Sequence, residues 1–228
     1  MPAVQAVFFD LFNTLISVGR VPVSVGRLTA DILGFDHEQW NMVCFSNEHE
    51  ICAPTRHEDV LRKLAHSLDP AVPEHLIQQA TQERQARFDY ALCHIEGDVL
   101  SALSSLKKKS LQLCLISNAS TAEVSAWRHS PLADIFDHAI FSCECGMRKP
   151  DVTIFQHALQ CLQVNANDSL FVGDGGSNEF IGARASGLDT VLTRQFSRQS
   201  HQDMVKRQQG AAIKYEIEHV RDLVSLCE

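Results

Sequence analysis

The sequence predicts an α/β fold, in which a doubly wound parallel sheet carries an inserted all-helical unit. Short apolar runs such as Val7-Phe8-Phe9 end on polar residues, as strands buried on both faces do. These runs alternate with stretches of helical periodicity along most of the chain, which is typical of parallel sheets covered by helices. Residues 17–96 interrupt the alternation, because they contain helical patterns and no good parallel strand. We therefore expect a strand just before Asp10 and a helical insertion soon after it.

The insertion has the spacing of amphipathic helices. Val60, Leu64 and Leu68 recur at intervals that place their side chains on one helix face. Pro70 and Pro73 mark a connection between two helices. Helices are expected at residues 25–33, 37–48, 57–68 and 73–91.

The rest of the chain returns to alternating helices and strands. Lys107 to Lys109 close the first of these helices, where positive charge suits the negative end of the helix dipole. The segment 195–209 is rich in Gln, Ser and basic residues, and we expect a mobile surface loop there. The prediction is a core of residues 1–16 and 97–228 with the insertion at 17–96. Strands are expected at 111–116, 139–141, 169–173 and 190–192, and helices at 97–109, 121–129, 151–162 and 179–186.

Composition narrows the class of protein. The chain has 228 residues, of which 45% are apolar, enough for one substantial core with an insertion. Its net charge of −8 argues against a nucleic-acid partner. No apolar run reaches the roughly 18 residues of a transmembrane helix, and residues 1–9 lack the basic flank of a secretory signal. We therefore expect a cytoplasmic protein without a membrane partner.

The cysteines are expected to be reduced thiols. Without a secretory signal, reduced cysteine is the default state. Cys114 lies in a predicted strand and Cys161 on an apolar helix face, and both are expected to pack as small hydrophobic side chains. Cys143 and Cys145 are closer in sequence than zinc ligands usually are, and no second Cys or His pair at zinc spacing accompanies them. A zinc site is therefore not expected.

Reactive side chains follow the predicted strands. Asp10 follows the first strand, Ser117 and Asn118 the second, and Asp174 the strand at 169–173, with Lys149 in the loop before helix 151–162. The carboxyl ends of parallel strands share one edge of the sheet, and ligands bind at that edge in open α/β sheets. We expect these side chains to meet there.

This ordered set of residues resembles the haloacid dehalogenase (HAD) superfamily, a large group of hydrolases that includes many phosphatases. The resemblance covers residues 6–187 and is specific because of Lys149-Pro150-Asp151, Gly173-Asp174-Gly175 and Gly182-Ala183 in combination. It implies a Rossmann-like HAD core with a helical cap. An ordinary nucleotide-binding domain is disfavoured, because no glycine-rich loop follows the first strand.

The resemblance implies roles for the residues at the strand ends. Asp10 would be the nucleophile that forms a covalent aspartyl intermediate, which water then resolves. Ser117 and Asn118 would donate hydrogen bonds to an anionic oxygen of the substrate, and Lys149 would neutralise Asp10 and the transferred group. The structural alternatives are a turn cap for Asp10, a helix N-cap for Ser117 and a solvated surface charge for Lys149.

Magnesium is the cofactor that the resemblance implies. Mg²⁺ takes hard oxygen ligands and keeps several waters. Asp10, Asp174 and the main-chain carbonyl of Phe12 would provide the ligands. Asn178 stands where many relatives carry an aspartate, with Glu179 beside it, and both are expected as outer or water-mediated ligands.

Phe12 departs from the phosphatase pattern. Relatives that hydrolyse phosphomonoesters usually have a second aspartate two residues after the nucleophile, which protonates the leaving oxygen. Phenylalanine cannot do so, and loss of such assistance typically costs about 10²–10⁴-fold in rate. Phe12 and Asn118 resemble the dehalogenase branch, whereas Asp174 resembles the metal-dependent phosphatases.

The sequence therefore predicts a HAD-like hydrolase, with a Mg²⁺-dependent phosphatase for a small phosphorylated metabolite as the first hypothesis. Its substrate would be an acyl phosphate or phosphoanhydride that needs no proton, or the cap would supply an acid or base from Glu48, His49 or His57. A 2-haloacid dehalogenase-like carbon-centre hydrolase is one alternative. A weakly active or non-catalytic member that binds an anion or a protein is another.

The remaining expectations concern ligands and assembly. Phe12, Asn13, Thr14 and Arg56 are expected to contact a small anionic substrate. The protein is expected to be a monomer or a homodimer.

Overall fold

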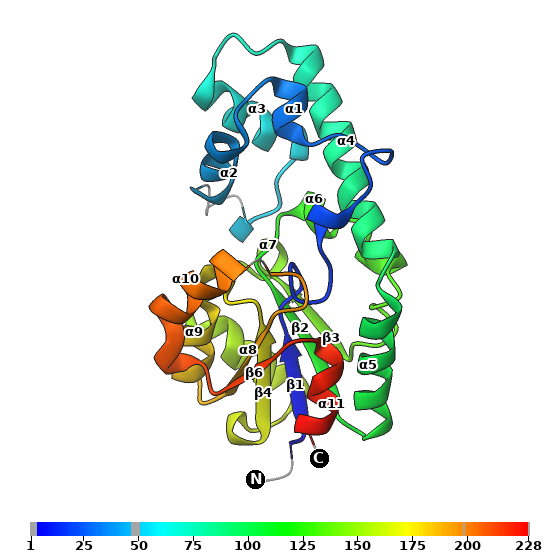
Figure 1. The fold of residues 1–228 in the computed structure, drawn as a ribbon, viewed down its shortest axis with the longest axis vertical. Helices are drawn as coiled ribbons and strands as arrows, with labels where there is room; N and C mark the ends of the chain where they lie inside the picture. Colours follow the sequence, from blue (N-terminus) through cyan, green and yellow to red (C-terminus); the bar gives the residue numbers. More distant parts are fainter. Residues whose placement is uncertain (1–3, 47–50, 198, 228) are drawn as a thin grey trace.

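The computed structural model describes residues 4–46, 51–197 and 199–227. An α/β part with a parallel sheet lies below a smaller helical part along the long axis of the molecule (Figure 1). The six strands are ordered β3-β2-β1-β4-β5-β6, and every neighbouring pair is parallel. The strands are β1 (Ala6–Phe9), β2 (Gln112–Ser117), β3 (His138–Phe141), β4 (Ser169–Gly173), β5 (Asp189–Thr193) and β6 (Tyr215–Ile217).

Both faces of the sheet are buried, as the apolar runs predict. In the central strand β1, Val7 and Phe9 belong to one hydrophobic cluster, whereas Ala6 and Phe8 belong to another. Alternate side chains of a strand point to opposite faces, so each cluster fills one side of the sheet. The predicted doubly wound α/β class is confirmed.

Helices cover each face. The first cluster takes in α5 (Gly97–Lys108) and α11 (Leu223–Leu226), and the second takes in α8 (Val152–Leu162), α9 (Glu179–Ala185) and α10 (Gln199–Gln209). These two groups lie on opposite sides of the sheet in Figure 1. Two short helices, α6 (Thr121–Val124) and α7 (Ser142–Cys145), follow the ends of β2 and β3.

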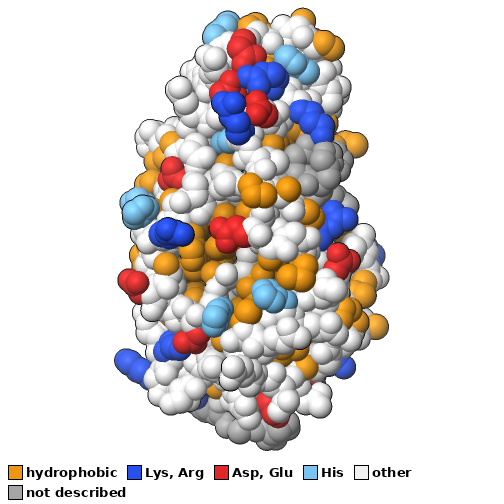
Figure 2. Space-filling model, turned by 180° about the vertical axis from the view of Figure 1, so that it is seen from behind, with side chains coloured by type: hydrophobic (Ala, Val, Ile, Leu, Met, Phe, Trp, Pro, Cys, Tyr) orange, Lys and Arg blue, Asp and Glu red, His pale blue; other side chains and the backbone are white. Residues whose placement is uncertain are grey.

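The chain between β1 and α5 forms the helical part. Its helices pack around a hydrophobic cluster that includes Trp40, Leu61, Leu64 and Ile77. Figure 2 shows charges of both signs gathered on this part, where Arg62 pairs with Glu58, Asp59 and Glu74. The helices are α1 (Thr29–Leu33), α2 (His37–Ser46), α3 (His57–Leu68) and α4 (Glu74–Cys93). The bounds of the cap at residues 17 and 96 stay a prediction.

The helix expected at 25–33 is shorter than predicted, since α1 begins only at Thr29. Buried Arg87 of α4 explains why the preceding backbone is not helical. Its guanidinium donates to the carbonyls of Val18, Val21 and Gly26, at 2.7, 3.2 and 2.8 Å. Because these carbonyls accept hydrogen bonds from Arg87, they do not accept the backbone hydrogen bonds that a helix would need.

The segment expected to be a mobile loop is instead largely helix α10, so that prediction was wrong. Gln202 and Gln209 are both buried, whereas most other polar residues of the helix are exposed. The Gln209 amide donates to the carbonyl of Gly175 at 2.7 Å and accepts from the backbone N–H of Phe180 at 3.2 Å. Polar composition was misleading here, because a glutamine such as Gln209 can be buried when it satisfies a neighbouring loop.

Two smaller differences complete the comparison. The helix expected at 121–129 divides into α6 and a 3-10 turn, η3 (Trp127–His129), and β6 was not predicted. The expected end of the helix at Glu48 lies outside the described residues. No helix in the described ranges has the length and apolar character needed to cross a membrane.

Helix α9 lies very close to the Lys149–Pro150 segment, whose peptide bond is cis. A Cβ atom on Gly182 would be 2.1 Å from the carbonyl oxygen of Pro150 and 2.7 Å from the ring of Phe155. Only a residue without a side chain fits there, so Gly182 determines how closely α9 approaches this loop.

We expect Gly182→Ala to lower the free energy of unfolding by about 1–3 kcal/mol, the usual cost of overpacking. Gly97→Ala is the matched control, because a Cβ at that helix start meets no atom within 4 Å. Urea unfolding of the two variants measures the difference. Equal stability of both would show that the close approach to Pro150 is not a constraint.

Candidate active site

Four of the predicted site residues, Asp10, Ser117, Lys149 and Asp174, lie at the carboxyl ends of the strands or reach them from a loop. These strand ends face the helical part (Figure 1). Asp10 follows β1, Ser117 ends β2, and Asp174 follows β4. Lys149 reaches the same place from the segment between α7 and α8. Their exposed fractions are only 7% for Asp10, 5% for Asp174, 3% for Lys149 and zero for Ser117. Such burial excludes a solvated surface charge as the interpretation of Lys149.

The Lys149 ammonium joins two carboxylates. Its Nζ donates to Asp10 Oδ1 at 2.5 Å and to Glu179 Oε2 at 2.6 Å. Thr14 Oγ1 donates to the other oxygen of Asp10 at 2.9 Å, and the N–H of Gly175 donates to Glu179 Oε1 at 2.8 Å. Each carboxylate is thereby oriented through both of its oxygens.

Burial and charge act against each other in this cluster. Burial raises the pKa of Asp10, the Lys149 ammonium opposes that rise, and the nearby Asp174 carboxylate adds to it. Burial likewise raises the pKa of Glu179 against the attraction of Lys149. Burial would lower the pKa of Lys149, but Asp10 and Glu179 raise it above its ordinary value. Lys149 therefore remains charged, with more acidic groups around it than it can neutralise.

The acidic side chains could hold a divalent cation. Asp10, Asp174 and Glu179 each offer an oxygen atom, and these atoms lie within 4.8 Å of one another. All three residues are buried, and hard carboxylate oxygens are the ligands that Mg²⁺ prefers. A dication would offset the excess negative charge, so the residues fit the expected cofactor.

Asn178 is not part of this cluster. Its side chain is exposed, and Ser177 and Asn178 have positive φ angles of 54° and 53° in the turn before α9. This turn directs the next residue, Glu179, into the site. The structure thus gives the inner position to Glu179, and Asn178 as a metal ligand finds no support in the geometry. The carbonyl of Phe12 as a ligand stays a prediction.

Ser117 and Asn118 have different surroundings. Ser117 Oγ is buried and has no hydrogen-bond partner within the described structure. Asn118 donates from Nδ2 to the carbonyl of Lys149 and accepts on Oδ1 from the Lys149 N–H, both at 2.8 Å. Ser117 is therefore free to bind a substrate oxygen, whereas the Asn118 side chain holds the backbone of Lys149.

The loop after Asp10 contains the other residues expected to bind substrate. Thr14 is buried on Asp10, and half-buried Phe12 packs against the core. Asn13 is exposed, with a φ of 58°, and its N–H donates to the Ile16 carbonyl at 2.6 Å. Arg56 is not brought to the cluster, because its side chain is 79% exposed and lies 3.8 Å from Asp59.

Of the three candidate acids or bases in the cap, only His57 lies among the described residues. Glu48 and His49 lie outside the described residues. His57 is half-buried beside the ring of Phe88. Burial, assisted by the charge of Arg84, lowers the pKa of His57 to about 4. His57 is therefore neutral at pH 7.

The helical part is anchored next to the loop that carries Ser117. Gln85 of α4 donates to the Ala122 carbonyl at 2.9 Å and to Ser125 Oγ at 2.8 Å. Glu123 lies 3.9 Å from Arg84 of α4 and accepts from the N–H of Ser120 at 2.7 Å. These contacts tie α4 to α6 immediately after the second strand.

His201 is a neighbour of the site that sequence reasoning missed. Its Nε2 lies 3.3 Å from Asp174 Oδ2 and 3.2 Å from the Asp174 carbonyl oxygen. The hydrogen bond to Asp174 raises the pKa of His201. No sequence signal distinguished this histidine, because the segment around it was interpreted as a loop.

Comparison with known proteins identifies what this arrangement is similar to. A family model described as haloacid dehalogenase-like hydrolase matches residues 4–187. Bifunctional epoxide hydrolase 2 of Rattus norvegicus is 33% identical over 105 residues, which cover 44% of this chain and 19% of that protein. Glyceraldehyde 3-phosphate phosphatase of Methanothermobacter thermautotrophicus is 27% identical over 121 residues, which cover 52% and 53%. The chain thus spans about half or less of these relatives' length.

A solved structure described as a dehalogenase superposes with a TM-score of 0.71. The match covers 99% of this chain and 98% of the other, at 20% sequence identity. Identity this low establishes a shared fold and says nothing further about chemistry.

Replacing Lys149 should show how far the buried carboxylates destabilise the folded protein when their cation is removed. Lys149→Met leaves Asp10 and Glu179 without their cation, and we expect a loss of about 3–5 kcal/mol in the free energy of unfolding at pH 7. The loss should grow as the pH rises through about 8, the raised pKa of Glu179, and shrink below it, because the folded variant then holds protons in place of the missing cation. Urea unfolding across this pH range is the measurement.

The double variant Lys149→Met/Glu179→Gln is the control, because it removes one of the stranded charges. It should recover part of the stability at pH 7. A loss in Lys149→Met that is independent of pH, with no recovery in the double variant, would refute this electrostatic account.

Proposed function

Since the chain belongs to the haloacid dehalogenase-like hydrolase family, we propose that it is a Mg²⁺-dependent phosphatase acting on a small phosphorylated metabolite. The observation that carries the proposal is the buried cluster, in which Asp10 is oriented by Lys149 and Thr14 beside two further carboxylates. The similarity to a glyceraldehyde 3-phosphate phosphatase supports a small phosphorylated substrate, but not the narrower class that Phe12 indicates.

The reaction begins at Asp10. One of its carboxylate oxygens forms a bond to phosphorus while the bond from phosphorus to the leaving oxygen breaks, and the phosphoryl group is then carried on Asp10. Water next attacks the phosphorus, releases inorganic phosphate and restores the carboxylate. Hydrogen bonds from Lys149 and Thr14 orient the carboxylate, which lowers the entropic part of the barrier.

Two groups of the site stabilise the negative charge of the transferred phosphoryl group. The unpartnered Oγ of Ser117 donates to a phosphoryl oxygen, and the Lys149 ammonium lies next to the nucleophile. Asn118 keeps Lys149 in position through its backbone. Asp10, Asp174 and Glu179 would hold Mg²⁺, which when bound supplies the positive charge that lets an anionic phosphoryl group approach an anionic carboxylate.

Phe12 limits the substrates. Phe12 cannot protonate the leaving oxygen. His57 is neutral at pH 7, so it lacks the acidic proton that a general acid would donate. An acyl phosphate or phosphoanhydride departs without a proton, so we infer that the substrate belongs to one of these classes.

A dehalogenase-like reaction is the second candidate, favoured by Phe12. In that reaction Asp10 would attack carbon and a halide would leave without a proton. The crowded carboxylates argue against it, because a metal-free site leaves their charge uncompensated. A weakly active or non-catalytic anion- or protein-binding member is the remaining alternative.

Asp10→Asn tests the proposal on a panel of phosphate esters, acyl phosphates and haloacids. We expect turnover of phosphorylated substrates in the wild type and a loss of roughly 10³-fold or more in the variant. Thermal stability should change little, because Lys149 keeps Glu179 as a partner. Turnover of haloacids alone would favour the second candidate, and unchanged turnover in Asp10→Asn would exclude Asp10 as the nucleophile.

The role of Phe12 predicts a steep dependence of rate on leaving-group acidity. Acetyl phosphate should turn over far faster than an alkyl phosphate. Phe12→Asp should raise the alkyl rate by up to about 10²-fold, the usual worth of a general acid. Phe12→Leu is the control for the lost ring, and unfolding measurements monitor stability. Equal rates for acetyl and alkyl phosphate in the wild type would mean that another residue already protonates the leaving group.

A further inference from the structure

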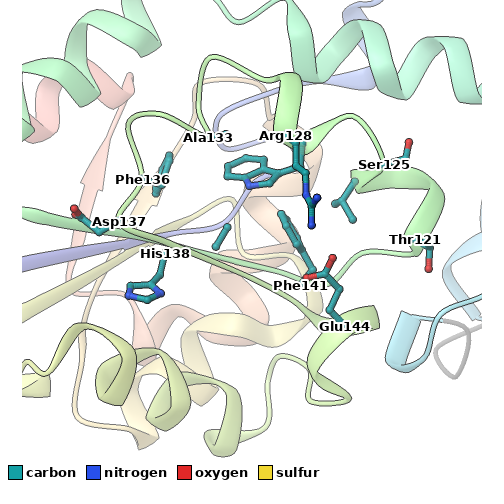
Figure 3. Close-up of a pocket in the computed structure, with 12 residues that line it drawn as sticks. Thr121, Ser125, Arg128, Ala133, Phe136, Asp137, His138, Phe141 and Glu144 are labelled. Atoms are coloured by element: carbon teal, nitrogen blue, oxygen red, sulfur yellow. The ribbon is translucent and has the colours of Figure 1, made fainter.

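Two features outside the Asp10 cluster differ in how they relate to it. A hollow of about 420 Å³ lies beside β3, bounded by α6, the turn η3 and α7 (Figure 3). The described residues that line this hollow include no member of the cluster. Helix α10 is different, because His201 on this helix contacts Asp174 directly.

One face of α10 packs against the loop 174–180, which carries two of the three carboxylates of the cluster. His201, Val205 and Gln209 follow one another at intervals of four residues, so they lie on the same side of the helix. His201 is half-buried and the other two are buried, whereas Gln208 is exposed. The inward face of α10 is therefore the one that meets the loop.

Val205 and Gln209 hold the loop near both of its ends. Gly175 has a φ of 90°, and a Cβ atom there would collide with both methyl groups of Val205, so the valine occupies the space of the missing side chain. Gln209 donates from Nε2 to the Gly175 carbonyl at 2.7 Å and accepts on Oε1 from the N–H of Phe180 at 3.2 Å. Each of these two loop residues directly follows a carboxylate of the cluster, so α10 fixes the backbone beside both carboxylates.

His201 contacts the Asp174 carboxylate itself. Its Nε2 lies 3.3 Å from Oδ2 and 3.2 Å from the carbonyl oxygen of Asp174, and the N–H of Gly176 donates to Oδ1 at 2.9 Å. Both carboxylate oxygens thus have a nitrogen partner, which restricts rotation of the group. The ring nitrogen is not among the described ligand atoms that lie within 4.8 Å of one another. The geometry therefore places His201 behind Asp174 and not in a ligand position.

We propose that His201 is a positioning residue of the metal site, which holds the Asp174 carboxylate toward Asp10 and Glu179 before an ion binds. A ligating carboxylate that is already oriented by hydrogen bonds loses less freedom on binding, so the ion is held more tightly. Helix α10 lies outside residues 4–187, which the family model matches. The inference rests on the proposed Mg²⁺ site and assigns part of its support to this helix.

Calorimetric titration with Mg²⁺ in the absence of substrate tests this role. His201→Leu removes the donor and should weaken Mg²⁺ binding by about 10–100-fold, the usual effect of losing a partner of a metal ligand. His201→Gln keeps an N–H donor and should recover most of the affinity. Gln208→Ala, at an exposed position on the same helix, should bind like the wild type. The His201 side chain is 31% exposed, so the variants should fold, and thermal unfolding without Mg²⁺ checks this.

Turnover of acetyl phosphate separates positioning from catalysis. In His201→Leu, the Mg²⁺ concentration that gives half-maximal turnover should rise as the calorimetric affinity falls. The kcat at saturating Mg²⁺ should change much less, because His201 does not contact the reacting atoms. A kcat that stays low at saturating Mg²⁺, with unchanged Mg²⁺ affinity, would overturn the positioning role.

The binding data alone can also overturn the proposal. Unchanged Mg²⁺ affinity in His201→Leu would show that the contact serves only the packing of α10. Tighter binding would show that the histidine competes with the ion. An equal loss in His201→Leu and His201→Gln would show that the hydrogen-bond donor is not what matters. A wild type that binds no Mg²⁺ would instead remove the proposed metal site itself, and this inference with it.

Discussion

The buried ammonium of Lys149 determines how the site is assembled. It bonds to the carboxylate after β1 and to Glu179 at the start of α9, and its own backbone is held by Asn118 after β2. Three segments that are distant in sequence are thereby joined at one edge of the sheet. The close approach at Gly182 keeps α9 near enough for Glu179 to reach this cation.

The negative charges of the cluster outnumber its positive charges. Asp10, Asp174 and Glu179 bring more negative charge than one lysine can offset, and burial makes that excess costly. His201 donates toward Asp174 from helix α10. A divalent cation would balance the charges of these three carboxylates and Lys149.

Much of this could be predicted from the sequence, for physical reasons. Asp10, Ser117 and Asp174 follow apolar strands, and parallel strands end at a common edge, so their meeting follows from pattern alone. The inward turn of Glu179 does not, because it depends on the left-handed backbone of Ser177 and Asn178. Helix α10 was missed because buried glutamines such as Gln209 satisfy a neighbouring loop, which polar composition does not reveal.

Calorimetric titration with Mg²⁺ in the absence of substrate tests the central claim most directly. The wild type should bind the ion, Asp174→Asn should lose binding, and Asn178→Ala should bind like the wild type because its side chain is exposed. The absence of binding in the wild type would contradict the account. Loss of binding in Asn178→Ala with retention in Asp174→Asn would contradict it equally.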